Sequence, residues 1–197
     1  MADSRLLHSP LAQSLWPAAA GGQVARNLVL AVLGSVALAV SAKISVPFFP
    51  VPMTMQTFVV LTIGRAFGGR LAGATVLLYL AEGALGLPVF TKGAGLAYMA
   101  GPTGGYLLGF LVAAAAMGRL AEMGWDRSLA RTLPAMLLGQ VVIFGFGVAW
   151  LVQIVGDWDK ALTAGLLPFV WGEVFKTALA AATLPFAWRL LKRFRGL

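Results

Sequence analysis

Long, nearly uncharged apolar runs recur along this 197-residue chain and limit what it can fold into. A helix needs roughly 20 mostly apolar residues to cross the hydrocarbon core of a bilayer. Only 11% of the residues are charged, too few to cover the surface of a soluble domain. The sequence therefore predicts an all-α membrane protein with six transmembrane helices, which we place at 27–46, 53–68, 71–88, 104–122, 133–155 and 166–189.

The residues before the first predicted span form a separate N-terminal tail, 1–26. Pro10 and Pro17 break its short apolar runs, and no basic region precedes a long apolar core, so it lacks the form of a signal peptide. We expect this tail to be an amphipathic segment at the membrane surface. We expect residues 27–197 to form one six-helix transmembrane domain.

Lysine and arginine are divided unequally between the two sides of the predicted spans. The outer connections hold only Lys92 and Lys160, whereas eleven basic residues lie on the other side: Arg5, Arg26, Arg65, Arg70, Arg119, Arg127, Arg131, Arg189, Lys192, Arg193 and Arg195. Basic residues concentrate on the cytoplasmic side of membrane proteins. Both termini are therefore predicted to be cytoplasmic, in a multi-pass protein of the cytoplasmic membrane. The same placement accounts for the net charge of +8 without a nucleic-acid partner.

Two ionisable residues stand out inside the sixth predicted span. Charged groups are costly within a bilayer, so each is a functional candidate. Glu173 and Lys176 are three residues apart and share one helix face. They form either a hydrogen-bonding site for a polar head group or an ion pair that only helps the helices to pack.

Three further polar residues fall toward the outer side. Thr54 and Gln56 follow the proline-rich outer connection and supply neutral donors and acceptors. Glu82, in the third predicted span, either joins the same site or pairs with Lys43 or Lys92. The proline-rich connection is stiff and the connection from 86 to 105 is rich in glycine, so the two form either a lid over a cavity or simple surface caps.

Small residues repeat at four-residue spacing in the first predicted span, at Ala31, Ser35 and Ala39. Such a stripe gives a smooth face for another helix. That helix belongs either to this chain or to a partner.

The sequence lacks the residues that several classes of function require. The chain has no cysteine and one histidine, His8 in the tail, which excludes thiolate and histidine metal sites and leaves no catalytic residues to name. No GxxxxGK[ST] motif for ATP is present. We expect no cofactor, and energy for transport has to come from a partner or a gradient. An intramembrane enzyme and a purely structural membrane protein are the less favoured alternatives.

Three motifs in order resemble one known family. VPMTMQT at 51–57, GLPVF at 86–90 and GPTGGY at 101–106 are similar to those of the BioY family, the biotin-specific substrate-binding (S) components of energy-coupling factor (ECF) transporters. The resemblance covers about 27–190. It implies a six-helix fold, biotin as the transported ligand captured at the outer face, and a transmembrane coupling subunit and ABC-type ATPases as partners that drive release inward. Association of several copies stays open.

The resemblance also implies site residues. The predicted biotin site consists of Glu173, Lys176, Gln56, Thr54, Glu82, Lys92, Gly93, Tyr98 and Tyr106, and the predicted interface with the coupling subunit consists of Ala31, Ser35 and Ala39. Two positions depart from the family pattern: Glu173 replaces the usual aspartate, and Ala94 stands where members can carry asparagine. These departures keep an S component or transporter for another small vitamin as the alternative function.

Overall fold

The protein is described by a computed structural model that covers residues 10–16, 20–126, 128–180 and 186. Its elements are α1 (Leu11–Leu15), η2 (Ala20–Gly22), α2 (Gln23–Lys43), β1 (Ser45–Val46), β2 (Met53–Thr54), α3 (Gln56–Phe67), α4 (Gly69–Ala84), α5 (Leu96–Met99), α6 (Gly104–Glu122), α7 (Leu129–Val155), α8 (Trp158–Gly165) and η3 (Leu167–Phe169). A last helical stretch covers 170–180, and most of the remainder of the sixth predicted span lies outside the described residues.

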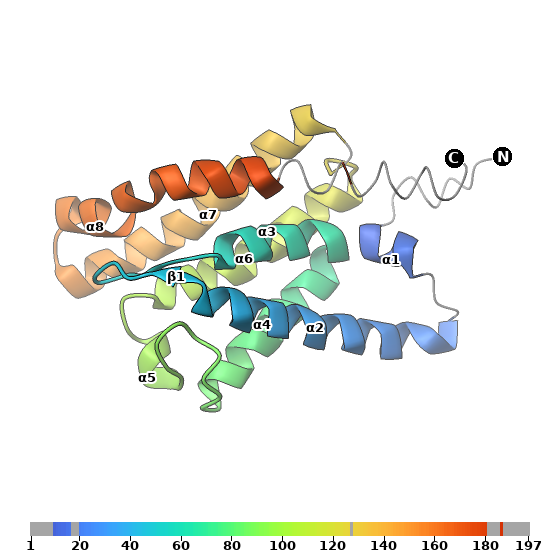
Figure 1. The fold of residues 1–197 in the computed structure, drawn as a ribbon, viewed down its shortest axis with the longest axis horizontal. Helices are drawn as coiled ribbons and strands as arrows, with labels where there is room; N and C mark the ends of the chain where they lie inside the picture. Colours follow the sequence, from blue (N-terminus) through green and yellow to red (C-terminus); the bar gives the residue numbers. More distant parts are fainter. Residues whose placement is uncertain (1–9, 17–19, 127, 181–185, 187–197) are drawn as a thin grey trace.

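The helices form a bundle with α6 near its centre (Figure 1). α6 packs against α7, α3 and α4, and α2 packs against α4. Glycines allow these close crossings: a Cβ on Gly109 of α6 would lie 2.9 Å from the Cα of Ile143 in α7, and one on Gly118 would lie 2.2 Å from the backbone nitrogen of Gly69. Small residues at helix contacts are typical of membrane proteins, where close van der Waals packing has to replace the hydrophobic effect.

The predicted helix positions agree with the structure to different degrees. α6 covers the predicted range, while α2 begins at Gln23 rather than 27 and α7 begins at Leu129 rather than 133. α2, α6 and α7 are long and apolar enough to cross a membrane. α3 has 12 residues and α4 has 16, shorter than a full span, and they meet at Gly68. The mostly helical membrane fold is thus supported, and six full spans remain a prediction.

The connections differ from the sequence-based expectation. The proline-rich connection, expected to be stiff, forms a short β-hairpin in which Ser45 pairs with Thr54 and Val46 with Met53. The connection between the fifth and sixth predicted spans contains α8, whose N-terminus is capped by the Asp157 carboxylate, which accepts from the backbone N–H of Lys160 at 2.8 Å.

The described part of the N-terminal tail packs against the bundle. Leu11 of α1 is 6% exposed, α1 contacts α3, and a Cβ on Gly68 would lie 2.7 Å from the Pro10 ring. Residues 10–16 therefore pack against the bundle, and the location of the tail at the membrane surface stays a prediction.

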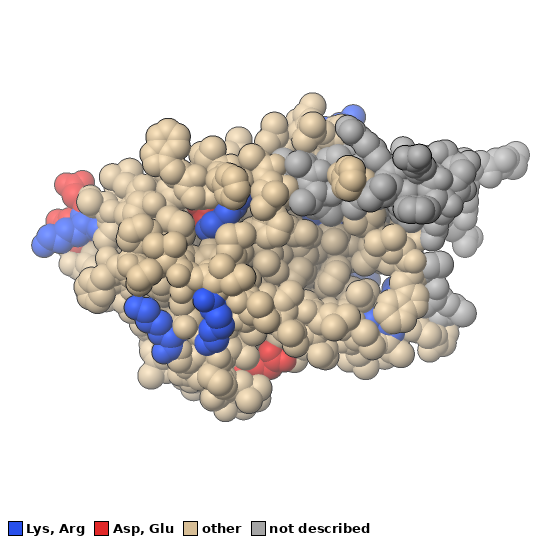
Figure 2. Space-filling model, viewed as in Figure 1, with Lys and Arg blue, Asp and Glu red and all other residues tan. Residues whose placement is uncertain are grey.

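The outer surface of the bundle is largely uncharged. On the face shown in Figure 2, uncharged residues cover most of the surface and charged side chains are sparse. Large apolar side chains along α2 point outward, with Leu28, Val32 and Val36 each at least half exposed. A continuous apolar surface of this kind suits contact with lipid.

Candidate functional site

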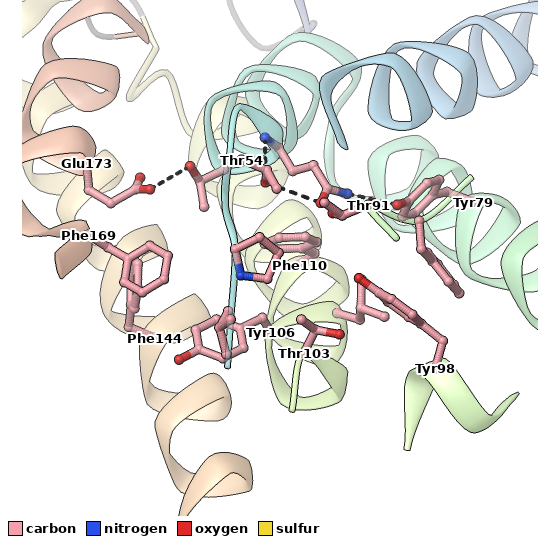
Figure 3. A pocket seen from close by; sticks show the side chains of 16 residues that line it. Thr54, Tyr79, Thr91, Tyr98, Thr103, Tyr106, Phe110, Phe144, Phe169 and Glu173 are labelled. Carbon is pink, nitrogen blue, oxygen red and sulfur yellow. Dashed lines mark hydrogen bonds between the residues drawn. The ribbon is translucent and has the colours of Figure 1, made fainter. Parts of the chain in front are cut away.

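A small cavity lies beneath the β1–β2 hairpin (Figure 3). It is at the end of the bundle where α2 ends and α3 begins. About 40 Å³ of it is open to the centre of a water-sized sphere, which is room for about three waters. The hairpin segment, α3, α4, the glycine-rich connection, α6, α7 and the residues after α8 all contribute to its wall. The lining residues are Val51, Pro52, Thr54, Gln56, Thr57, Tyr79, Phe90, Thr91, Tyr98, Thr103, Tyr106, Leu107, Phe110, Phe144, Phe169 and Glu173.

Glu173 forms the charged part of this wall and is 7% exposed. Its Oε1 accepts from the Lys176 Nζ at 2.6 Å and from the Thr57 hydroxyl at 3.0 Å, and its Oε2 accepts from the Gln140 amide at 2.7 Å. Three donors from three helices therefore hold one buried carboxylate. Charge-assisted hydrogen bonds of this type are about twice as strong as neutral ones.

Lys176 lies behind Glu173 rather than in the cavity wall. Besides the carboxylate, its Nζ donates to the Thr54 carbonyl at 2.6 Å and contacts the Thr57 hydroxyl at 3.2 Å. An ammonium has three N–H donors, and here each has an acceptor within the chain. Lys176 therefore fixes the carboxylate and ties the helix at 170–180 to the end of the hairpin.

A second polar group forms the opposite wall. The Gln56 amide donates to the Tyr79 hydroxyl at 2.8 Å, and that hydroxyl donates to the Val89 carbonyl at 3.2 Å. The Thr54 hydroxyl donates to the Gln56 side-chain carbonyl at 3.3 Å. This chain of bonds connects the hairpin, α3, α4 and the glycine-rich connection. Figure 3 shows Glu173 approaching from one side of the cavity and Tyr79 from the other.

Aromatic rings close the space between the polar walls. Phe90 stacks on Tyr98 with ring centroids 5.0 Å apart and meets Tyr79 edge-on at 5.5 Å. Gly83 of α4 makes this possible, because a Cβ there would lie 2.0 Å from the Phe90 ring. On the far side Phe144 contacts both Tyr106 and Phe169. Flat aromatic faces suit a ring system held between them.

The structure brings five of the nine predicted site residues to the cavity: Thr54, Gln56, Tyr98, Tyr106 and Glu173. Lys176 is one hydrogen bond behind the wall. Lys92 and Gly93 do not line the cavity: Lys92 is exposed, and Gly93 pairs with Phe90 in the turn of the glycine-rich connection. A ligand-binding role for each of these residues stays a prediction.

Glu82 also lies outside the cavity wall. Its Oε2 accepts a short hydrogen bond from the Ser35 hydroxyl, which joins α4 to α2, so its partner is neither Lys43 nor Lys92. Lys43 instead donates to the Phe90 carbonyl. Ser35 is fully buried, Ala31 is 9% exposed and Ala39 is half-buried. The small-residue stripe thus packs against helices of this chain, and contact with a partner stays a prediction.

Several residues of the cavity wall, or bonded to it, were not predicted from the sequence. Thr57 sits in a recognised motif but lacks a charge, and Gln140, which bonds to Glu173 from outside the wall, is one of two amides within the apolar run of α7. Tyr79, Phe90 and Phe110 look like ordinary apolar residues of buried segments. Gln140 carried a usable signal, since an amide in a long apolar helix needs a partner. Among the described residues, no group of three or more acidic or histidine side chains could hold a metal ion.

The chain is similar to known proteins over most of its length. The model described as BioY family matches residues 11–193. "Biotin transporter BioY" of Thermotoga maritima is 39% identical over 158 residues, 79% of this chain and 92% of that protein. "Biotin transporter BioY2" of Lactococcus lactis is 38% identical over 160 residues, 78% and 85% of the two chains.

A solved structure shares the fold. The crystal structure of the S-component for biotin from an ECF-type ABC transporter superposes with a TM-score of 0.74. It covers 91% of this chain and 96% of the compared chain, at 22% identity. The helical arrangement is therefore common to both chains.

Proposed function

Because the chain belongs to the BioY family, we propose that it is the biotin-binding S component of an ECF transporter. It captures biotin at the outer face of the cytoplasmic membrane. A transmembrane coupling subunit and a pair of ABC-type ATPases then drive release to the inside. The family is one of transport subunits, so the chain is a multi-pass membrane protein and not an enzyme.

One observation carries the proposal: three sequence motifs far apart in the chain supply one cavity. Thr54, Gln56 and Thr57 come from the first motif, Phe90 from the second, and Thr103 and Tyr106 from the third. A cavity with aromatic walls and a few converging polar groups has the usual character of a small-molecule site.

The chemistry of this cavity fits biotin. The ureido ring of biotin has two N–H donors and one carbonyl acceptor, and its thiophane ring is apolar. Glu173 offers a carboxylate acceptor, while the hydroxyls of Thr91 and Thr103 offer donors to a carbonyl or carboxylate. The stacked Phe90 and Tyr98 rings offer an apolar wall to the ring system. In this assignment Glu173 contacts the ligand and Lys176 positions Glu173.

The orientation in the membrane follows from the charges. Arg26, Arg70, Arg119 and Arg131 lie at or near the bundle end where α2 and α4 begin and α6 ends, and the cavity lies at the opposite end. With basic residues on the cytoplasmic side, the cavity faces outward.

Equilibrium binding of radiolabelled biotin to the purified protein in detergent tests the function. We expect saturable binding at submicromolar biotin, displaced by unlabelled biotin and not by an excess of other vitamins such as thiamine or riboflavin. Lys160→Gln, at an exposed position outside the cavity wall, serves as the control variant and keeps the affinity within about twofold, about 0.4 kcal/mol. Absence of saturable binding by protein that elutes as one folded species overturns the assignment.

A further inference from the structure

A second, larger groove lies at the bundle end opposite the proposed biotin cavity. About 660 Å³ of it is open to the centre of a water-sized sphere. It runs between α2 and α4, with α1 and the end of α6 at its mouth. The lining residues are Gln13, Val24, Asn27, Leu28, Ala31, Phe67, Arg70, Leu71, Ala74, Arg119 and Glu122.

The mouth of the groove has surplus positive charge. Glu122 is already engaged, since its Oε1 accepts from the backbone N–H of Gly69 at 2.9 Å and its Oε2 lies 4.0 Å from the Arg119 Nε. Arg70 is exposed and has no hydrogen bond or ion pair with any residue that the structure describes. Arg119 lies against Gly69, the residue that precedes Arg70. The two arginines therefore line the same mouth of the groove.

Below the mouth the groove is apolar. Val24, Leu28 and Ala31 form one stripe of α2, and Leu71 and Ala74 face them from α4. From Val24 to Ala31 the stripe extends about 10 Å along the helix at 1.5 Å per residue. A trough of this composition leaves apolar surface uncovered by the rest of the chain, and an alkyl chain can cover it.

We propose that this groove binds one anionic glycerophospholipid of the cytoplasmic leaflet. Its phosphate pairs with Arg70 and Arg119, and one acyl chain lies between α2 and α4. Two arginines at one mouth match a phosphate by charge and by hydrogen-bonding geometry. The apolar trough below them favours a ligand with a hydrocarbon tail over a free anion. This site goes beyond the proposed transport function and depends only on the proposed membrane orientation.

A lipid bound in this groove also affects how α1 docks against α2. Arg26 of α2 donates from its Nη1 to the Trp16 carbonyl at 3.1 Å, which holds the end of α1 near the start of α2. The groove is bounded by both elements, through Gln13 and Val24. A bound lipid therefore stabilises the folded chain and the docking of α1, by an amount that grows with its concentration relative to Kd.

Thermal unfolding and native mass spectrometry of the purified full chain in detergent test the site. Added phosphatidylglycerol is expected to raise Tm and to leave one retained lipid per chain. Phosphatidylcholine with the same acyl chains and inorganic phosphate are each expected to do neither. In the double variant Arg70→Gln/Arg119→Gln the retention of phosphatidylglycerol falls at least tenfold. Arg131→Gln, an exposed arginine outside the groove lining, keeps it.

The possible results distinguish an anionic lipid from a neutral lipid, inorganic phosphate and a partner protein as the occupant of the groove. Equal stabilisation by phosphatidylcholine, or stabilisation by inorganic phosphate alone, overturns the proposal, because the charge or the chain is then irrelevant. Slower hydrogen exchange in α1 and α2 on adding the coupling subunit, with none on adding phosphatidylglycerol, assigns the groove to a protein and overturns it as well. Lipid titration of the unsubstituted chain decides the matter even where the double variant fails to fold. Biotin binding is expected to stay unchanged throughout, so failure here is distinct from failure of the transport function.

Discussion

Replacing Lys176 by methionine isolates the role of the buried ion pair. Methionine has a similar length and no N–H donors, so Lys176→Met removes the 2.6 Å bond to Glu173 and the bonds to Thr54 and Thr57 together. The Glu173 carboxylate, 7% exposed, is left with the Thr57 and Gln140 donors alone. Removing one partner of a buried pair costs about 3–5 kcal/mol, because the other charge stays buried and uncompensated.

A double-mutant cycle tests this energetic cost. We expect Lys176→Met to lower the free energy of unfolding by about 3–5 kcal/mol. The double variant Glu173→Gln/Lys176→Met leaves neither member of this pair charged, so it should lose less than the sum of the two single variants, with a coupling of at least about 1.5 kcal/mol. The measurement is reversible unfolding in mixed micelles, followed by circular dichroism.

Biotin affinity provides the second readout. If Lys176 holds Glu173 in the orientation that meets the ligand, Lys176→Met weakens binding at least tenfold, about 1.4 kcal/mol. Lys160→Met is the matched control, since Lys160 is exposed and only its backbone N–H takes part in a described bond; it should change stability by less than about 0.5 kcal/mol. Additive losses in the cycle, or a Lys176→Met affinity equal to that of the control, would refute the reasoning.

Two further substitutions test the walls of the cavity. Gly83→Ala puts a Cβ 2.0 Å from the Phe90 ring and should weaken biotin binding at least tenfold. Gly73→Ala in the same helix is the control, because its Cβ meets the nearest neighbour at 3.7 Å and biotin should bind normally. Equal affinities of the two variants would show that the position of the Phe90 ring does not affect binding. Gln140→Leu removes the 2.7 Å bond to the buried carboxylate and should destabilise the chain by about 1.5–3 kcal/mol in the same unfolding assay. Gln153→Leu, exposed on the same helix, should change stability by less than about 0.5 kcal/mol, and a loss as large as that of Gln140→Leu would contradict this role.

The sequence predicts the charged part of the candidate site well because charge inside an apolar run is rare. Glu173 and Lys176 stand out for that reason, and their spacing on a helix already places them on one face. Lys92 is also charged, but it lies in a connection, where a charged side chain is exposed to water without an energetic cost. Its charge therefore does not indicate a binding site. Thr57 escapes notice because it carries no charge. Gln140, as an amide in an apolar helix, needs a partner, but its partner Glu173 is far away in sequence and cannot be identified from the sequence alone.

The helices are predicted more reliably than the connections between them. A run such as 104–122 forms a helix from local composition alone, and α6 covers it. The hairpin, by contrast, depends on Ser45 meeting Thr54 across a turn of prolines, and two residues per strand are too few to give an alternating pattern. Ser35 illustrates the same limit on helix faces: the four-residue spacing predicts a smooth contact face, while only the partner Glu82 reveals which helix it meets.

The size of the cavity determines which part of the protein has to move when biotin binds. Room for about three waters is far too little for a fused two-ring head group with an alkyl tail. The helices cannot supply the space cheaply, because α6 and α7 already touch backbone to backbone at Gly109 and Ile143 and gain their stability from that contact. The hairpin is different. Its strands pair over two residues each, and Phe49 at its turn is 93% exposed, although Val51 next to the turn packs into the core at 4% exposed. We therefore expect the hairpin, rather than the helices, to lift when biotin enters. Because the Thr54 carbonyl accepts from the Lys176 ammonium, we expect this movement to loosen that bond as well.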